Sequence, residues 1–142
     1  MPNTFSGNVL AWPGEAARVF VMLYPTPAQS DEARRLRVLA DLNILDTATS
    51  PAFDRLCRLA CQIFAVPIAL VSLIDEDRQW FKATCGLSDD LRETPRDQAF
   101  CNHTILHDEV FVVPDARADA RFSRNPLVTG ELGIQFYAGA PL

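Results

Sequence analysis

The sequence has no apolar run long enough to cross a membrane and no region in which basic residues accumulate. The run from Val19 to Tyr24 is far shorter than the roughly 20 residues of a membrane helix, and no basic segment precedes it as in a secretory signal. The net charge is −5, and the arginines are scattered among acids, which argues against a nucleic-acid partner. We therefore predict a protein with no membrane span that does not bind nucleic acid.

Paired cysteine motifs are also missing. The four cysteines form no Cys-x-x-Cys pair and follow no secretory leader, so reduced thiols in a cytoplasmic setting are expected. Cys57 and Cys61 lie four residues apart on one face of an expected helix, where core packing is the usual role of a free thiol. With 142 residues, 49% of them hydrophobic, the chain suits one folded domain.

Hydrophobic periodicity divides the chain into an irregular start and a mixed domain of class α+β. Residues 1–29 are interrupted by prolines and glycines and hold no lasting period, so we expect a loose or disordered extension. The domain should span 30–142 and begin with an amphipathic helix near 30–42 and a second helix from Ser50 and Pro51. The second helix is expected to bury Phe53, Leu56, Cys57, Ala60, Cys61, Ile63 and Phe64.

Four strands are expected after these helices. Residues 68–74 form a short, nearly continuous apolar run, which predicts a central strand covered on both faces. The segment "QWFKATC" predicts its hairpin partner, with Trp80 and Lys82 on a wetter face. "VFVVPDA" and "IQFYAGAPL" predict two more strands, and a short helix is expected from Pro95. In the polar loop between these last strands, Asp115 and Arg121 are expected to pair.

The stretch "QAFCNHTILH" carries the residues best suited to chemistry. His103 and His107 have the spacing of two ligands of one metal on a helix, but no third ligand is evident. Cys101 would point roughly 200° away from His103, so we expect no metal site. Neither a base nor an oxyanion hole is evident for Cys101, which favours core packing, while His103 can contact a ligand. A thiol or metal enzyme using Cys101, His103 and His107 remains an alternative.

The order of these elements and several sequence segments resemble the GAF domain, a small-molecule-sensing module of bacterial signalling proteins. The resemblance is greatest to the subgroup found in front of histidine kinase, diguanylate cyclase and cyclic-di-GMP phosphodiesterase outputs. The segments that carry it are "LNILDT", "FDRLCRLACQIFAVPIALVSLIDEDRQWFKATCGL", "ETPRDQAFCNHTIL", "VVPDARADARF", "NPLVTG" and "IQFYAGAPL".

The resemblance implies a regulatory input module with a pocket between the sheet and the short helix. It implies no catalysis and no cofactor in this chain, an unknown small-molecule ligand, and a homodimer formed through the N-terminal helix or an exposed sheet edge. The cyclic-nucleotide motif of one GAF branch is absent, and Asn102 separates Cys101 from His103, unlike the bilin-binding branch. The candidate pocket residues are Trp80, Phe100, His103, Arg121, Phe122 and Tyr137.

The resemblance further implies a last strand beside residues 68–74, followed by a helix, that the sequence does not supply. We therefore expect a central antiparallel sheet that is incomplete at its C-terminal side, with an open apolar edge on 68–74. The chain would then be a fragment, a truncated reading frame or a domain completed by another chain. The alternative function is a structural dimerisation domain with a vestigial pocket.

Overall fold

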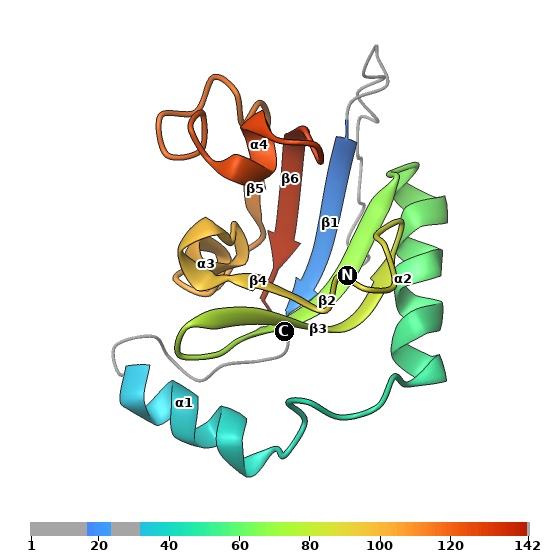
Figure 1. Ribbon diagram of the computed structural model, residues 1–142, viewed down its shortest axis with the longest axis vertical. Coiled ribbons are helices and arrows are strands. Elements are labelled where there is room, and N and C mark those ends of the chain that lie inside the picture. The colour runs from blue at the N-terminus through green and yellow to red at the C-terminus, as the bar shows by residue number, and fades with distance from the viewer. Residues whose placement is uncertain (1–16, 24–31, 142) are drawn as a thin grey trace, which may run out of the picture.

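The computed structural model describes residues 17–23 and 32–141, which form one six-stranded sheet with helices on both faces (Figure 1). The strand order is β4-β3-β2-β1-β6-β5. The strands are β1 (Ala17–Leu23), β2 (Ile68–Ile74), β3 (Arg78–Cys85), β4 (Glu93–Pro95), β5 (Phe111–Val113) and β6 (Ile134–Ala140). The helices are α1 (Glu32–Asp41), α2 (Pro51–Phe64), α3 (Cys101–Thr104), α4 (Pro126–Thr129) and the 3-10 turn η1 (Arg96–Gln98). The predicted α+β fold class is confirmed.

The position beside β2 is filled by a segment that we expected to be loose. β1 pairs in parallel with β2 on one side and with β6 on the other, with Val19 opposite Ile68 and Tyr137. The remaining pairings, β2 with β3, β3 with β4 and β5 with β6, are antiparallel. The expected open edge on β2 is therefore wrong, because β1 is hydrogen-bonded along it. The expected loose state of residues 17–23 is also wrong, because this segment forms a strand that pairs with β2 and β6. Residues 1–16 and 24–29 of that expected extension lie outside the described residues.

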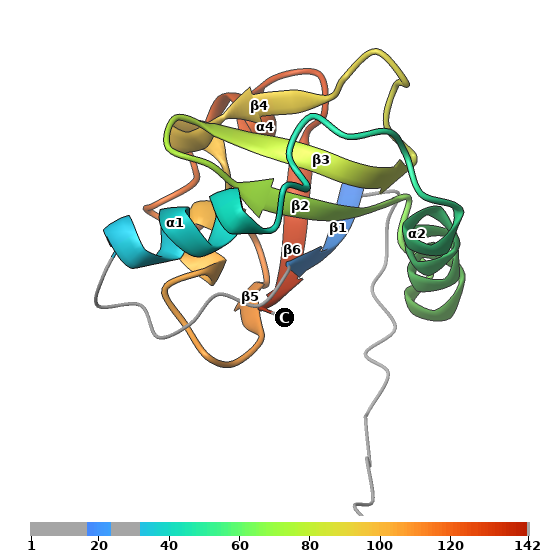
Figure 2. The ribbon, with the colours of Figure 1, turned by 90° about the horizontal axis from the view of Figure 1, so that it is seen from below.

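The two faces of the sheet pack against different helices (Figure 2). Ala69 and Val71 of β2 face α2, and Leu73 packs with Leu39 of α1. Side chains of the opposite parity, such as Ile68 and Leu70, face α3 and α4. Every residue of β2 is buried, which confirms the prediction of a strand covered on both faces.

Helix α2 buries less of its surface than its sequence predicted. It begins at Pro51 as expected, although the Ser50 side chain makes no capping hydrogen bond. Leu56, Ile63 and Phe64 are 44%, 66% and 51% exposed, so their expected burial is wrong. The sheet beneath α2 offers only the narrow strip of Ala69, Val71 and Ala83, and this strip is covered by Cys57 and Ala60.

The expected wetter face of β3 is buried. Trp80 and Lys82 are only 4% and 7% exposed. Trp80 packs with Leu39 and Leu73, while the Lys82 ammonium donates hydrogen bonds of 2.7 Å to Thr47 Oγ1 and to the Ala48 carbonyl. The connection between α1 and α2 therefore covers this face, which the alternation along β3 alone could not indicate.

Two local expectations around α3 are also wrong. No helix starts at Pro95, because that residue ends β4, and α3 begins only at Cys101 after the turn η1. Asp115 does not pair with Arg121. It binds Arg117, and Arg121 binds Asp119 at 2.6 Å, since each arginine reaches the acid two residues before it.

Candidate functional site

A mostly apolar cavity lies between the sheet and the segment that contains α3 and α4. Its volume is about 40 Å³, more than the roughly 10–15 Å³ that one water molecule requires. Phe100 and Tyr137, whose rings stack with centroids 5.0 Å apart, contribute an aromatic wall, and Val19 of β1 also lines the cavity. The other lining residues are Ile68, Leu70, Gln79, Phe81, Leu87, Leu91, Thr94, Cys101, Leu127, Leu132 and Ile134.

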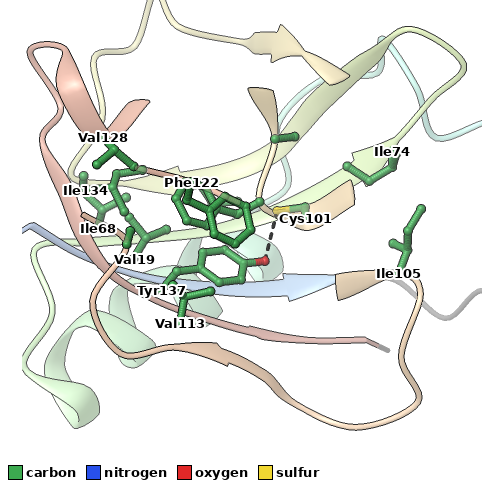
Figure 3. Close-up of a cluster of buried hydrophobic side chains, with 14 of the residues drawn as sticks. Val19, Ile68, Ile74, Cys101, Ile105, Val113, Phe122, Val128, Ile134 and Tyr137 are labelled. Carbon is green, nitrogen blue, oxygen red and sulfur yellow. Dashed lines mark hydrogen bonds between the residues drawn. The ribbon is translucent and has the colours of Figure 1, made fainter. Parts of the chain in front are cut away.

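A chain of buried polar groups forms the hydrophilic part of the cavity wall. Gln79 Nε2 donates to Cys101 Sγ at 2.9 Å and to Ser72 Oγ at 2.9 Å, and Thr94 Oγ1 donates to Gln79 Oε1 at 3.3 Å. Tyr137 Oη donates to Cys101 Sγ at 3.4 Å, the contact drawn in Figure 3. Because these groups satisfy one another, none of them presents an unpartnered polar atom to the cavity.

The tyrosine hydroxyl is held from a second side. Tyr137 Oη lies 2.6 Å from Thr104 Oγ1, which brings α3 onto β6. A Cβ atom at Gly139 would collide with both of these oxygens, so glycine is required for this close approach. Burial raises the pKa of Tyr137 well above its usual value, and the neighbouring Cys101 adds to this effect. The Tyr137 phenol is therefore a neutral hydrogen-bonding group.

Behind the cavity wall, His103, Arg121 and Phe122 form a cluster that extends to the surface. Phe122 stacks on Phe100 with ring centroids 4.2 Å apart, and His103 meets Phe122 edge-on at 4.8 Å. The Arg121 guanidinium lies 5.3 Å from the Phe122 ring and is 48% exposed. Burial lowers the pKa of His103, and the positive charge of Arg121 lowers it further. A neutral His103 is therefore favoured near pH 7.

The six candidate pocket residues lie in three places. Phe100 and Tyr137 line the cavity, and His103, Arg121 and Phe122 lie in the layer behind it. Trp80 lies on the opposite face of the sheet, against Leu39, so the expectation that it shares this pocket is wrong. The alternation of polar and apolar residues could not show which face of β3 carries Trp80, because both faces of the strand are buried.

Sequence reasoning missed the polar wall formed by Ser72, Gln79 and Thr94. Ser72 interrupts an otherwise apolar strand, and this interruption was the available signal that the strand approaches polar partners. Gln79 and Thr94 face each other across the β3–β4 pairing, which no local pattern indicated. The apolar lining from Leu87, Leu91, Leu127 and Leu132 comes from loop or short helical segments, where leucine carries no periodic signal.

The arrangement suits binding better than catalysis. Cys101 is 1% exposed, and burial raises the pKa of its thiol, which opposes the nucleophilic thiolate form. Its hydrogen-bonding partners are Ser72, Gln79 and Tyr137, none of which is a general base near neutral pH. Within residues 17–23 and 32–141, no three His, Cys, Asp or Glu side chains gather to hold a metal ion. In the same ranges no helix has the length and apolarity that a membrane crossing requires.

Comparison with known proteins agrees with this architecture. The family model of the GAF domain matches residues 49–142. A protein of Pseudomonas aeruginosa named as a cyclic di-GMP phosphodiesterase is 45% identical over 116 residues, which cover 82% of this chain. The matched region spans only 19% of that relative.

A small cavity between a mixed sheet and a short helix defines the class of small α+β modules with an internal pocket. Within this class, the match to residues 49–142, more than half of the chain, identifies the family: the chain belongs to the GAF domain family.

Proposed function

We propose that this chain is the sensory input module of a bacterial signal transduction protein and that it binds a small, largely apolar molecule in the cavity. The observation that supports this function is the cavity itself, with apolar walls and a single polar side at Gln79, Thr94, Cys101 and Tyr137. A ligand of this kind gains from burial of its apolar surface and from one or two hydrogen bonds to the polar side. Catalysis would belong to an output domain, such as a kinase or a cyclic-di-GMP enzyme.

The size of the cavity narrows the ligand class. A volume of about 40 Å³ admits only a few water-sized groups, which is far too little for a nucleotide or a tetrapyrrole in this conformation. A larger ligand would require α3, α4 or the loop with Leu87 and Leu91 to move outward. The proposed ligand is therefore a compact molecule. We also propose that the protein binds it in the cytoplasm.

A polar connection links the cavity wall to α1. Asn102, next to Cys101, accepts a hydrogen bond of 2.9 Å from Arg96 Nε. The same guanidinium donates to Glu32 Oε1 of α1 at 2.7 Å and to the Asp75 carbonyl at 3.0 Å. In this proposal, a ligand that displaces α3 changes how α1 is held, and it shifts the balance of two conformers only by its differential affinity for them.

Binding to compact apolar probes tests the proposal. We expect a compact probe such as xenon or ethanol to raise the Tm of the purified chain and to bind saturably. Leu91→Phe should remove this response by filling the cavity, because Leu91 lines it. The matched control is Leu106→Phe, since Leu106 is 59% exposed and does not line the cavity. Equal responses of Leu91→Phe and wild type, or no response to any probe, would contradict the proposal.

A structural dimerisation domain is the second candidate, and one observation favours it. Leu56, Leu59 and Ile63 of α2 are 44%, 50% and 66% exposed and recur at helical spacing. Such a stripe suits a helical contact with a second copy. The expected homodimer through the N-terminal helix or a sheet edge has no comparable support, and both remain proposals. A stable dimer that binds none of the apolar probes would favour this candidate over the sensory module.

A further inference from the structure

Three cysteines from two distant parts of the sequence meet on the sheet face that carries α2. Cys57 and Cys61 come from α2, and Cys85 is the last residue of β3, opposite Ala69 of β2. All three pack in one cluster with Ala60, Ala69, Val71 and Ala83. Helix α2 lies on the face of the sheet opposite to α3 and α4 (Figures 1 and 2). The cavity lies on the side of α3 and α4, so the cluster has no part in the proposed binding site.

Within this cluster, Cys61 and Cys85 differ from Cys57 in access and in partners. Both are half-buried, whereas Cys57 is completely buried and hydrogen-bonded to the backbone of Val71. Cys61 and Cys85 pack against the same apolar cluster, and burial together with the neighbouring Cys85 thiol raises the pKa of Cys61. Two half-buried thiols that different elements bring to one cluster are candidates for a direct cross-link.

We propose that Cys61 and Cys85 are a site of reversible oxidation, in which a peroxide converts the two thiols into a disulfide that joins α2 to β3. In the first step the sulfur of one of the two cysteines attacks one peroxide oxygen, the O–O bond breaks, and a sulfenic acid and one water molecule form. The sulfur of the other cysteine then attacks the sulfenic acid sulfur, the S–O bond breaks, and a second water molecule leaves. Two thiols lose two electrons and two protons in total, and hydrogen peroxide becomes two water molecules.

The two cysteines have equivalent roles in these steps: either sulfur forms the sulfenic acid, and the other sulfur resolves it. The product would fix the C-terminal turn of α2 to the end of β3 and close a loop that contains β2. By constraining the unfolded chain it should raise Tm.

Peptide mapping tests this assignment directly, because trypsin separates the cysteines. Cleavage after arginine and lysine places Cys57 in residues 56–58, Cys61 in 59–78, Cys85 in 83–92 and Cys101 in 97–117. The reduced full chain would be treated with hydrogen peroxide, blocked with N-ethylmaleimide in acidic denaturant and digested without reductant. We expect the 59–78 and 83–92 peptides to be joined, with the loss of two hydrogen atoms, and dithiothreitol to separate them.

Serine variants provide the controls. Cys61→Ser and Cys85→Ser should each abolish the joined peptide and leave the remaining cysteine to form a sulfenic acid that dimedone traps. Cys57→Ser and Cys101→Ser should leave the joined peptide unchanged. A joined pair of 56–58 with 83–92, a cross-link found only between chains, or peroxide-treated protein with four free thiols would each overturn the proposal. The wild-type map decides this even if one variant fails to fold.

Discussion

At the scale of single residues, the attachment of α1 rests on one carboxylate shared by two arginines. Glu32 binds the buried Arg35 at 2.7 Å and Arg96 at 2.7 Å. Arg35 also donates to the Ile74 carbonyl at the end of β2. The hydrogen bond from Arg35 is the largest cause that lowers the pKa of Glu32, from its ordinary 4.5 to about 2, and Arg96 adds to it. Glu32 should therefore be ionised in the folded protein well below pH 4.

This shift makes stability depend on pH in a defined window. Because the folded-state pKa is lowered, the contribution of Glu32 is complete above about pH 4.5 and is lost as the pH falls toward 2. Glu32 is 48% exposed, and solvent screening reduces the expected contribution to on the order of 1 kcal/mol. Urea unfolding at pH 6 and at pH 2.5 gives the loss in the free energy of unfolding between these pH values. The loss in wild type minus the loss in Glu32→Gln is the contribution of the Glu32 carboxylate.

The difference between the two proteins is needed because Asp119, held by Arg121, also has its pKa lowered to about 2. Asp119 titrates equally in both proteins and cancels. Equal losses of stability in wild type and Glu32→Gln would show that the carboxylate of Glu32 does not hold α1.

Lys82 provides a second test at this scale. Its buried ammonium anchors the connection between α1 and α2 through Thr47 and Ala48, and it lies 5.9 Å from the centre of the Trp80 ring. Lys82→Met keeps most of the apolar stem but removes both charge-assisted hydrogen bonds. We expect a loss of about 2 kcal/mol in the free energy of unfolding, measured by urea denaturation. Arg124→Met, at an exposed position, should change it by less than about 0.5 kcal/mol.

The residues in and around the cavity show how much of a site can be predicted from a sequence. Phe100 and Tyr137, which line the cavity, were predicted as pocket residues because the resemblance to a family placed the pocket between the sheet and the short helix. Trp80 was misplaced because β3 is buried on both faces, so alternation gave no side to choose. Gln79 was missed because its partners, Ser72, Thr94 and Cys101, come from three other segments and meet only in the folded chain.

At the scale of elements, α2 combines a narrow buried stripe with an apolar outer surface. Leu59→Glu and Ile63→Glu each introduce charge at positions that are 50% and 66% exposed. We expect each to change the free energy of unfolding by less than about 0.5 kcal/mol, because little burial is lost. If the outer stripe contacts a second copy, both should also shift the protein toward monomer in light scattering at increasing concentration.

Arg58→Glu is the control for charge, since it alters an exposed position of the same helix without removing apolar surface. A large loss of stability in Leu59→Glu would mean that this residue supports the fold of the monomer. An unchanged oligomeric state in both glutamate variants would remove the observation that favours a dimerisation domain.

The elements themselves were largely predictable, whereas their extent of burial was not. Both long helices and the strands β2, β3, β5 and β6 fall where periodicity predicted them. The expected burial of Leu56 and Ile63 failed because the period of a helix identifies an apolar stripe but not the width of the surface beneath it. The expected helix at Pro95 failed because the same proline also fits the end of an edge strand.

At the scale of the whole molecule, β1 connects the start of the chain to both halves of the sheet. Val19 lies opposite Ile68 of β2 and Tyr137 of β6, and these three residues line the cavity. A short apolar run between prolines carries no signal of its pairing partners, because parallel pairing with two distant strands is decided by tertiary structure. The N-terminal strand is therefore part of both the core and the candidate site.

The substitution Val19→Pro tests whether residues 17–23 form a paired strand or a loose extension. In a strand that is paired on both sides, Val19→Pro removes a backbone donor, and it also removes a side chain that is 4% exposed. We expect a loss of at least about 3 kcal/mol in the free energy of unfolding, together with weaker binding of any apolar probe in the cavity. Asp89→Pro is the matched control, because Asp89 is the second residue of the turn closed by Leu91 N–H on the Ser88 carbonyl at 3.0 Å, where proline is favoured. If both proline variants were as stable as wild type in urea, β1 would contribute nothing to the folded sheet, and the cavity would have to be formed without it.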